Sequence, residues 1–294
     1  MIQAKHFIFV GLALLVTACS TVKLSYNNAE WLLMRALNSY FDLDATQEAK
    51  SRIQVRELLT WHRRTQLITY AQLLTDAAQL VQHPVRDADV LDLIQRVNTH
   101  FSALGQRVGP ALAELLLTLD SAQIAHCERK QAESAQALRD DLLEFDDNTR
   151  LAKPRLAWYK KHATFWFGSI APEQLTLISA ITATRPVGEV WWISERERRQ
   201  SEFIQLLQRL HSERPSTDEA AQWIQMYIAQ LMTPPDPERR EGLRAFRHSN
   251  SELIAQLINA ATIAQRQNLT KKLRGYAEDL RTLAQVEPSA TPRK

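Results

Sequence analysis

The sequence predicts an all-α protein built as an elongated multi-helix bundle. Three observations support this fold class. Glycine makes up only 7 of the 294 residues, about 2% against a usual value of about 7%, and glycine is unfavourable inside helices. Apolar residues recur at steps of three and four, as in the run Leu67, Tyr70, Leu74, Ala77 and Val81, and this spacing places them on one helix face. The sequence has no alternating run of β-branched residues long enough to indicate a strand.

Proline and glycine divide the chain into successive helices. Breaks are expected at 83–84, 105–110, 154, 168–172, 186–188, 215 and 234–237. The helices expected between them are 28–40, 45–82, 88–104, 110–118, 121–150, 155–167, 172–184, 189–212, 217–232, 238–247 and 250–285. The last of these is expected to break near Asn268.

Three of these helices are expected to start at a recurring pattern, Leu or Ile followed four residues later by Gln. In Leu43–Gln47 and Leu119–Gln123 an aspartate stands at the N-cap and Gln three residues later, so each side chain can bond the backbone N–H of the other residue. The third copy, Ile170–Gln174, has Pro172 at the first helical position and Ala171 at the N-cap. Half of this third capping box is therefore missing.

The first residues have the parts of a secretion signal. Lys5 supplies a positive charge, and Phe7–Val16 is an apolar run of about ten residues, shorter than the roughly 20 that cross a bilayer. The motif Val-Thr-Ala-Cys that ends at Cys19 resembles the lipobox of bacterial lipoproteins. The resemblance implies cleavage before Cys19, a diacylglycerol thioether on its sulfur and an acylated amino terminus. The alternative is an ordinary secreted protein in which Cys19 is incidental.

The residue after Cys19 bears on which membrane receives the protein. Aspartate there usually retains such lipoproteins in the inner membrane, so Ser20 implies the periplasmic face of the outer membrane of a Gram-negative bacterium. The expected organisation is a signal peptide at 1–18, a lipidated tether at 19–26, a helical domain at 27–285 that divides, if at all, near 150–154, and a disordered tail at 286–294. An extended tether would reach roughly 25 Å, which keeps the folded body near the membrane.

Composition excludes several classes of function. Removing residues 1–18 takes away one basic residue and leaves a net charge of +2, too small to indicate a nucleic-acid partner. Cys127 would be the only free cysteine, so no intrachain disulfide is expected. The sequence has no glycine-rich phosphate loop, no His-Glu-x-x-His and no Gly-x-Ser-x-Gly motif. We therefore expect no cofactor, no metal and no catalytic residue.

Three weaker signals of catalysis or metal binding are present, and two of them have structural explanations. His126 and Cys127 are neighbours, but adjacent helical residues point about 100° apart, and an inert buried thiol is expected instead. An acidic run (Asp140, Asp141, Glu144, Asp146 and Asp147) lacks the loop geometry of a calcium site and is expected to be a solvated helix end. A lone glutamate acting as an acid, such as Glu144 or Glu189, would suit a cell-wall hydrolase, which we rank last.

Two aromatic clusters are the best candidates for binding a partner. They contain Trp158, Phe165, Trp166, Trp191 and Trp192. Exposed, they would form an apolar surface for a polypeptide, a lipid or a partner helix; buried, they would form a junction where several helices meet. Because Trp191 and Trp192 are consecutive, we expect at least one of them to be exposed.

Several motifs together resemble a known family. They are NNAEWLLMRALNSYFDLDATQ, LLTWHRR, LDSAQIAHCERK, KPRLAWYKK and FWFGSIAPEQ. They are similar to a family of uncharacterised lipoproteins from Gram-negative bacteria, known only as a domain of unknown function. The resemblance covers the chain to about residue 285 and implies an all-helical envelope protein, but it implies no activity.

The Leu-x-x-x-Gln pattern separately resembles the Leu-Thr-x-x-Gln motif of small periplasmic chaperones, although Asp44, Asp120 and Ala171 stand where that motif has threonine. The resulting hypothesis is a non-catalytic interaction or structural module that binds an envelope protein and is held to the membrane through Cys19. The alternative is a holdase-like chaperone for unfolded polypeptide.

Overall fold

The computed structural model describes residues 21–143, 148–184 and 189–286. Within these ranges the chain forms twelve α-helices and no strand, which confirms the all-α prediction. The helices are α2 (Thr21–Asn27), α3 (Ala29–Phe41), α4 (Ala45–Thr65), α5 (Leu67–Leu80), α6 (Asp87–Leu116), α7 (Ser121–Leu143), α8 (Asn148–Phe167), α9 (Pro172–Thr184), α10 (Glu189–Glu213), α11 (Thr217–Met232), α12 (Pro237–Asn259) and α13 (Ile263–Gln285). Cys19 and the predicted disordered tail beyond Val286 lie outside the described residues.

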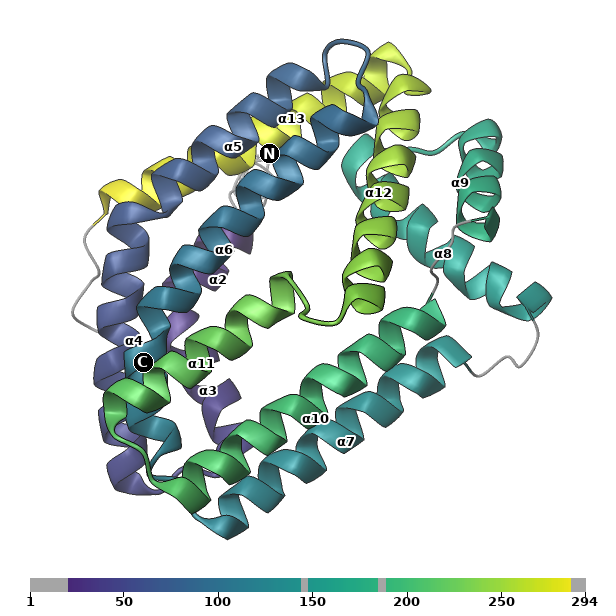
Figure 1. Ribbon diagram of the computed structural model, residues 1–294. Helices are drawn as coiled ribbons and strands as arrows, with labels where there is room; N and C mark the ends of the chain where they lie inside the picture. Colours follow the sequence, from purple (N-terminus) through teal and green to yellow (C-terminus); the bar gives the residue numbers. More distant parts are fainter. Residues whose placement is uncertain (1–20, 144–147, 185–188, 287–294) are drawn as a thin grey trace, which may run out of the picture.

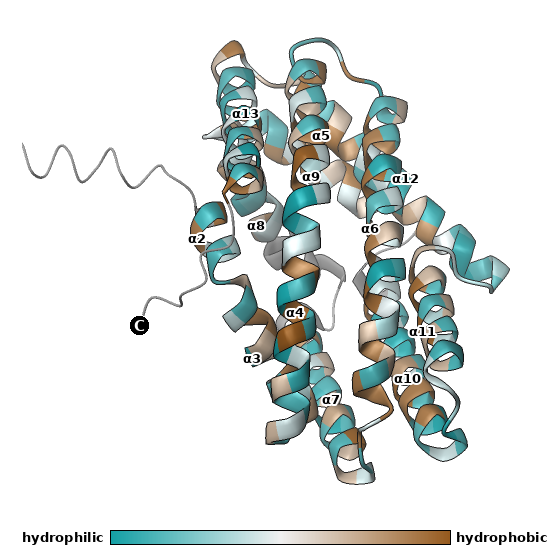
Figure 2. Ribbon diagram, turned by 90° about the vertical axis from the view of Figure 1, so that its left-hand side faces the viewer, coloured by the Kyte–Doolittle hydropathy of each residue, from teal (hydrophilic) through white to brown (hydrophobic). Residues whose placement is uncertain are grey.

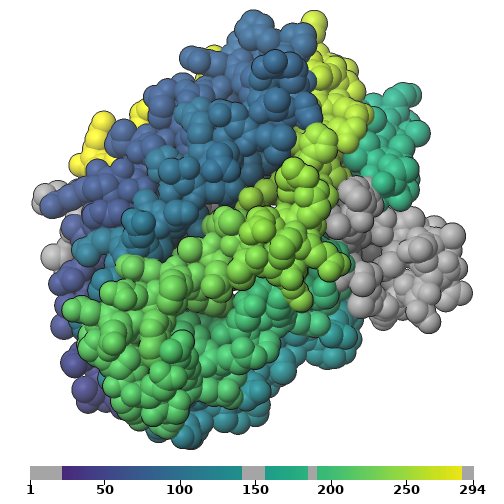
Figure 3. Space-filling model, in the orientation of Figure 1, coloured from purple at the N-terminus to yellow at the C-terminus, as the bar shows by residue number. Residues whose placement is uncertain are grey.

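The helices pack as a bundle in which segments far apart in the sequence lie side by side (Figure 1). α5 lies along α13, α7 lies along α10, and α6 packs against both α11 and α12. Figure 2 shows most of the helices running in one general direction. Figure 3 shows α6, α11 and α12 side by side on one face of the molecule.

Two buried apolar clusters form the core. The first joins α3, α6, α7, α10 and α11 and includes Leu43, Leu116, Leu119, Cys127, Leu207 and Leu210. The second joins α5, the beginning of α6, α8, α9, α12 and α13 and includes Phe167, Ile178, Leu253, Ile258, Leu269 and Leu273. Each cluster lies beside a junction at which two helices begin.

The first junction joins the beginnings of α4 and α7 through a reciprocal pair of glutamine amides. Gln47 Nε2 lies 3.1 Å from Gln123 Oε1, and Gln123 Nε2 lies 2.6 Å from Gln47 Oε1. Each amide also donates to a backbone carbonyl of the other loop: Gln47 to Thr118 O at 3.1 Å, and Gln123 to Asp42 O at 3.0 Å. We call this arrangement a glutamine clasp.

The same two glutamines complete the predicted capping boxes. Gln47 Oε1 accepts the backbone N–H of Asp44 at 3.0 Å, and Gln123 Oε1 accepts that of Asp120 at 3.1 Å. All the donors and acceptors of both amides therefore have partners. This matters because Gln47 is only 6% exposed, and an unpaired buried amide is destabilising.

A second clasp with the same geometry joins α9 and α13. Gln174 Nε2 lies 3.2 Å from Gln265 Oε1, and Gln265 Nε2 lies 2.9 Å from Gln174 Oε1. The amides also donate to Ala260 O at 3.5 Å and to Ser169 O at 2.8 Å. Their oxygens accept the backbone N–H groups at the two N-caps, Ala171 and Thr262, at 2.9 Å.

The two junctions also have equivalent helix contacts. In the first, α3 packs against α7 and α4 packs against α6. In the second, α8 packs against α13 and α9 packs against α12. In both cases the helix that leads into one loop packs against the helix that leaves the other loop, so each clasp has an approximate two-fold relation.

The structure corrects several predicted helix ends. The expected helix 45–82 is divided at Gln66, where buried Arg63 donates to Leu283 O at 2.9 Å and ties the end of α4 to α13. α12 continues through the expected gap at 247–250. The last break lies at 260–262 rather than near Asn268, because Thr262 and Gln265 form a capping box there.

α6 continues through the expected break at 105–110 because α11 compensates for the proline. Pro110 has no N–H to donate to Gln106 O, and Gln225 Nε2 of α11 donates to that carbonyl at 3.2 Å instead. The glycines allow this approach: a Cβ on Gly105 would lie 2.5 Å from Ile228 Cγ2, and one on Gly109 would lie 2.9 Å from Gln225 Cγ. α8 likewise continues through Pro154.

The expected tether at 19–26 is also corrected, because residues 21–27 form α2 and pack against α13. Lys23 Nζ lies 2.9 Å from Asp279 Oδ1 of α13. Tyr26 bonds His62 Nδ1 of α4 at 2.9 Å. The folded body therefore begins within two residues of Cys19.

We predict that replacing Gln47 with Ala lowers the free energy of unfolding by about 3 kcal/mol, because it removes a cap, takes away the donor to Thr118 O and leaves the half-buried amide of Gln123 without its Gln47 partner. The control is Glu219→Ala, since Glu219 caps α11 in an exposed box that touches no second loop and should cost about 1 kcal/mol or less. Urea denaturation of both variants measures the difference. Equal losses in the two variants would show that the clasp adds nothing to ordinary capping.

Candidate functional site

α8 presents the first of the predicted partner-binding residues. Trp158 and Phe165 lie on one face of this helix and are 55% and 47% exposed. Lys161 and His162 are exposed between them, since positions three, four and seven apart share a helix face. Phe167 on the opposite face is buried in the core. We call Trp158, Lys161, His162 and Phe165 the α8 stripe.

Cations and aromatic rings adjoin one another along this stripe. The rings of Trp158 and His162 have centroids 4.1 Å apart. Lys272 of α13 places its Nζ atom 4.0 Å from the centroid of the Phe165 ring. Trp166 is half-buried and packs edge-on against Tyr276 of α13, with centroids 5.9 Å apart. The structure therefore leaves Trp158 and Phe165 exposed and uses Trp166 to join α8 to α13.

Trp191 and Trp192 have a different position, at the contact between α10 and α12. Both rings stack on Phe246, with centroids 6.2 Å and 5.4 Å away. A Cβ on Gly242 would lie 2.7 Å from the Trp191 ring, so that glycine makes room for it. Both tryptophans are half-buried, which corrects the expectation that one of them is exposed. Both indoles pack between helices, and no ring contact joins them to the α8 stripe within the described residues.

A buried ion-pair network also joins α10 to α12. Glu195 is 1% exposed and bonds Arg198 at 2.7 Å, Arg199 at 2.9 Å and Arg239 of α12 at 3.0 Å. Burial alone raises the pKa of Glu195, but the hydrogen bonds and charges of Arg198 and Arg199 outweigh it and lower this pKa to about 2. Glu195 therefore remains ionised at neutral pH and cannot serve as a proton donor.

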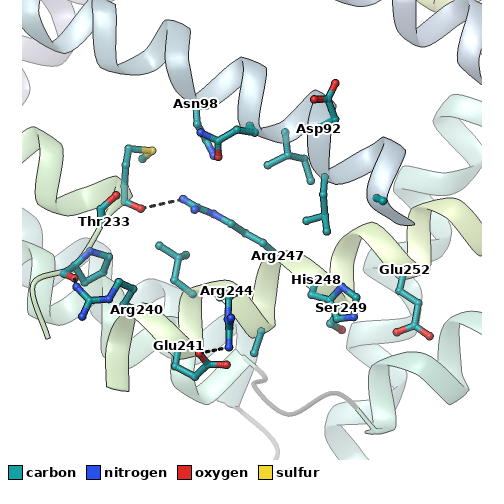
Figure 4. A pocket seen from close by; sticks show the side chains of 18 of the residues that line it. Asp92, Asn98, Thr233, Arg240, Glu241, Arg244, Arg247, His248, Ser249 and Glu252 are labelled. Atoms are coloured by element: carbon teal, nitrogen blue, oxygen red, sulfur yellow. Dashed lines mark hydrogen bonds and ion pairs between the residues drawn. The ribbon is translucent and has the colours of Figure 1, made fainter. Parts of the chain in front are cut away.

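A hollow of about 1020 Å³ lies where α12 meets α6, near the end of α9 (Figure 4). In Figure 4, Asp92 and Asn98 come from α6, while Arg247 extends from α12 into the hollow toward Thr233. Apolar side chains also contribute to the wall, namely Leu91, Ile94, Ile181, Met232 and Leu243. The volume is at the upper end of the range usual for small-molecule sites.

Two of the arginines in this hollow have carbonyl partners rather than carboxylates. Arg247 Nη2 donates to Met232 O at 3.3 Å, and Arg240 Nη1 donates to Pro234 O at 3.2 Å. Neither forms an ion pair with a carboxylate of the described residues. Burial, and secondarily the charge of Arg199, lowers the pKa of Arg247. Because a guanidinium has five N–H donors, both arginines retain donors with which an anionic group could be bound.

This hollow was not predicted from the sequence. A signal was present, since Arg240, Arg244 and Arg247 recur at steps of four and three and therefore share one face of α12. That spacing reads equally well as a solvated helix face. The contact with α6, which turns the face into the wall of a hollow, is not visible in the sequence.

The residues considered for catalysis do not form a site among the described residues. Cys127 is fully buried, and burial raises the pKa of its thiol to about 11. His126 bonds Ser39 O at 3.0 Å rather than the thiol. Within the described ranges no three His, Cys, Asp or Glu side chains are grouped to hold a metal ion. The side chains of Asp141, Glu144, Asp146, Asp147 and Glu189 lie outside the described part of the structure.

We predict that Glu195→Gln lowers the free energy of unfolding by about 3 kcal/mol at pH 7, because it removes the buried charge that Arg198, Arg199 and Arg239 share and leaves Arg198 with Glu202 as its carboxylate partner. The matched control is Glu213→Gln, whose partner Arg209 is half exposed and whose loss should cost about 0.5 kcal/mol or less.

The depressed pKa of Glu195 also sets the pH dependence of this effect. The stabilisation is present above the usual glutamate pKa of about 4.3 and is lost as the pH falls toward 2. The difference between wild type and Glu195→Gln should therefore shrink below pH 4.5 in urea titrations. A difference that stays constant from pH 7 to pH 3 would contradict the assignment.

The comparisons with known proteins identify a family and nothing beyond it. Residues 39–235 match the family of unknown function DUF6279, which covers more than half of the chain. No curated protein and no solved structure matches the chain. The matched region contains the first clasp, the α8 stripe and Glu195. The chain therefore belongs to DUF6279, a family of unknown function.

Proposed function

We propose that this protein is a lipoprotein of the Gram-negative outer membrane, cleaved before Cys19 and held to the periplasmic face by a lipid on that residue. The lipobox-like leader supports the proposal, and so does the start of the fold, since α2 begins at Thr21 and packs against α13. A lipid on Cys19 would hold the folded body directly against the bilayer. Among the described residues, no helix combines the length and apolarity needed to cross a membrane.

We further propose that the anchored body is a non-catalytic module that binds an envelope protein. The α8 stripe carries this proposal, because Trp158 and Phe165 are large aromatic side chains that the fold leaves exposed. Tryptophan is enriched at the centres of protein interfaces, where it contributes much of the binding free energy. Lys161 and Lys272 add cations beside the rings, which suits a partner that presents acidic side chains.

A holdase-like chaperone is the second candidate, because an exposed aromatic stripe would also suit unfolded polypeptide. The Leu-x-x-x-Gln boxes add no support to it. Their glutamines are bonded to one another within the clasps, so they are not available to a client. Suppression of aggregation by many unrelated clients would favour the chaperone, whereas one discrete partner would favour the interaction module.

The anchor predicts a defined chemical change at Cys19. The mature protein isolated from cells should lack residues 1–18 and carry the added mass of a diacylglycerol and an acyl chain, and it should fractionate with outer membranes. Cys19→Ser should retain neither lipid mass nor membrane association, since stable anchoring requires two or more chains. Intact-protein mass spectrometry and density-gradient fractionation measure both. A Cys19→Ser protein that still fractionates with the membrane would contradict the anchor.

The α8 stripe predicts a local contact with a partner. A photo-crosslinking residue at Phe165 should give one discrete crosslinked product in cells, and Trp158→Ala should reduce its yield about tenfold or more, as for an interface hot spot. Met226→Ala on α11 is the matched control, because Met226 is equally exposed at 55% and should leave the yield unchanged. Because Trp158 is exposed, its replacement should alter stability by no more than about 0.5 kcal/mol. Equal crosslinking yields in the two variants would contradict the claim that the α8 stripe contacts the partner.

A further inference from the structure

α3 has an apolar face that no other helix of the described residues covers. Trp31, Leu32, Leu33 and Tyr40 are 57%, 44%, 39% and 38% exposed. Leu24, on the neighbouring α2, is 67% exposed. The opposite side of α3 is an ordinary core face, because Met34 and Phe41 are buried there. At about 100° per helical residue, Trp31 and Leu32 lie on the side away from the core, whereas Leu33 and Tyr40 lie about half a turn from Trp31. We call Leu24, Trp31 and Leu32 the α2–α3 face.

The charges near this face suit a membrane surface. Glu30 is the only carboxylate of α3, and it is turned toward α4, where Arg56 and Arg52 bind it at 2.9 Å and 3.4 Å. The only cation of α3, Arg35, lies 5.3 Å from the centroid of the Trp31 ring. The α2–α3 face therefore combines two leucines and an indole ring with the neighbouring cation of Arg35, and α3 adds no carboxylate to it. This is the composition of helices that lie in the headgroup region of a bilayer, where Trp and Tyr are enriched.

The position of this face in the chain identifies its occupant. α2 begins at Thr21, so only Ser20 separates Cys19 from it. Leu24 is five residues from Cys19 in the sequence. α2 rises about 1.5 Å per residue, so Leu24 lies roughly one to two helix turns from the lipidated residue. α2 cannot swing as a free tether, because Lys23 and Tyr26 fasten it to α13 and α4.

We propose that the α2–α3 face lies in the headgroup region of the bilayer that holds the lipid of Cys19. This inference rests on the proposed lipid anchor and adds an orientation to it. The lipid and the face together fix which side of the body meets the membrane. In Figure 2, α2 and α3 lie on one side of the molecule and α11 and α12 on the other, so the hollow beside α12 faces away from the membrane.

Spin labels on the lipidated, full-length mature protein test this orientation. One label is attached through Leu32→Cys on the α2–α3 face and a matched one through Met226→Cys on α11. Both native side chains are exposed, so neither replacement disturbs the core. Cys127 remains unlabelled under mild conditions because its thiol is buried with a raised pKa. The protein is incorporated into vesicles of phosphatidylethanolamine and phosphatidylglycerol, and collisions with a water-soluble nickel chelate are measured.

The reference for each label is the same variant in the Cys19→Ser protein, free in buffer. We expect the collision rate at Leu32 to fall about fivefold or more on the vesicles, because an interfacial helix buries its apolar face below the headgroups, and the rate at Met226 to change less than about twofold. If the protein floats with the vesicles but the collision rate falls by the same factor at Leu32 and Met226, the α2–α3 contact is overturned and the anchor is left intact. Protein that carries no lipid mass and does not float would overturn both.

Discussion

The reciprocal amide pair between Gln47 and Gln123, with its counterpart between Gln174 and Gln265, is the interaction on which the arrangement of helices depends. Each glutamine caps its own helix and reaches across to the loop before the partner helix. Helix beginnings leave backbone N–H groups unpaired, and bringing two of them together in a core requires partners for all of these groups. The clasp glutamines accept the N-cap N–H of each helix and donate to the carbonyls of the facing loop, while Asp44 and Asp120 accept N–H groups of the first turn.

Because the clasps have the same geometry, the bundle contains the same junction twice. α3, α4, α6 and α7 meet at the first junction, and α8, α9, α12 and α13 meet at the second. The glutamines are 76 residues apart in one pair and 91 in the other. The two clasps therefore have the same hydrogen-bond geometry although the chain segments between their glutamines differ in length. α10 links the two halves, through α7 at one end and through Glu195 and Arg239 to α12.

Local features of this structure could be predicted from the sequence, whereas long-range ones could not. The all-α fold and the caps at Asp44 and Asp120 follow from neighbouring residues and are confirmed. The pairing of the boxes does not follow, because each partner lies in a distant part of the chain. The continuous α6 was missed for the same reason, since Gln225, 119 residues from Gln106, replaces the bond that Pro110 cannot make.

The same division applies to the candidate sites. The aromatic residues of α8 were identifiable from composition, and the structure leaves Trp158 and Phe165 exposed. Trp191 and Trp192 look similar in sequence, but they stack on Phe246 of α12, a contact that only the fold creates. The exposed side of α3 was hidden because a helix face with Trp and Leu reads as core. Its meaning depends on its position beside Cys19 and on the absence of a covering helix within the described structure.

Amide hydrogen exchange tests the central role of the clasps most directly. Four N-cap amides donate to clasp glutamines, those of Asp44, Asp120, Ala171 and Thr262. The amide of Ser216 donates to Glu219 in an exposed box and serves as the reference. If the clasps hold the bundle together, the four amides exchange only through global unfolding, as core helices do, and the Ser216 amide exchanges much faster. If all five exchange at the same fast rate, the clasps open locally and the account is contradicted.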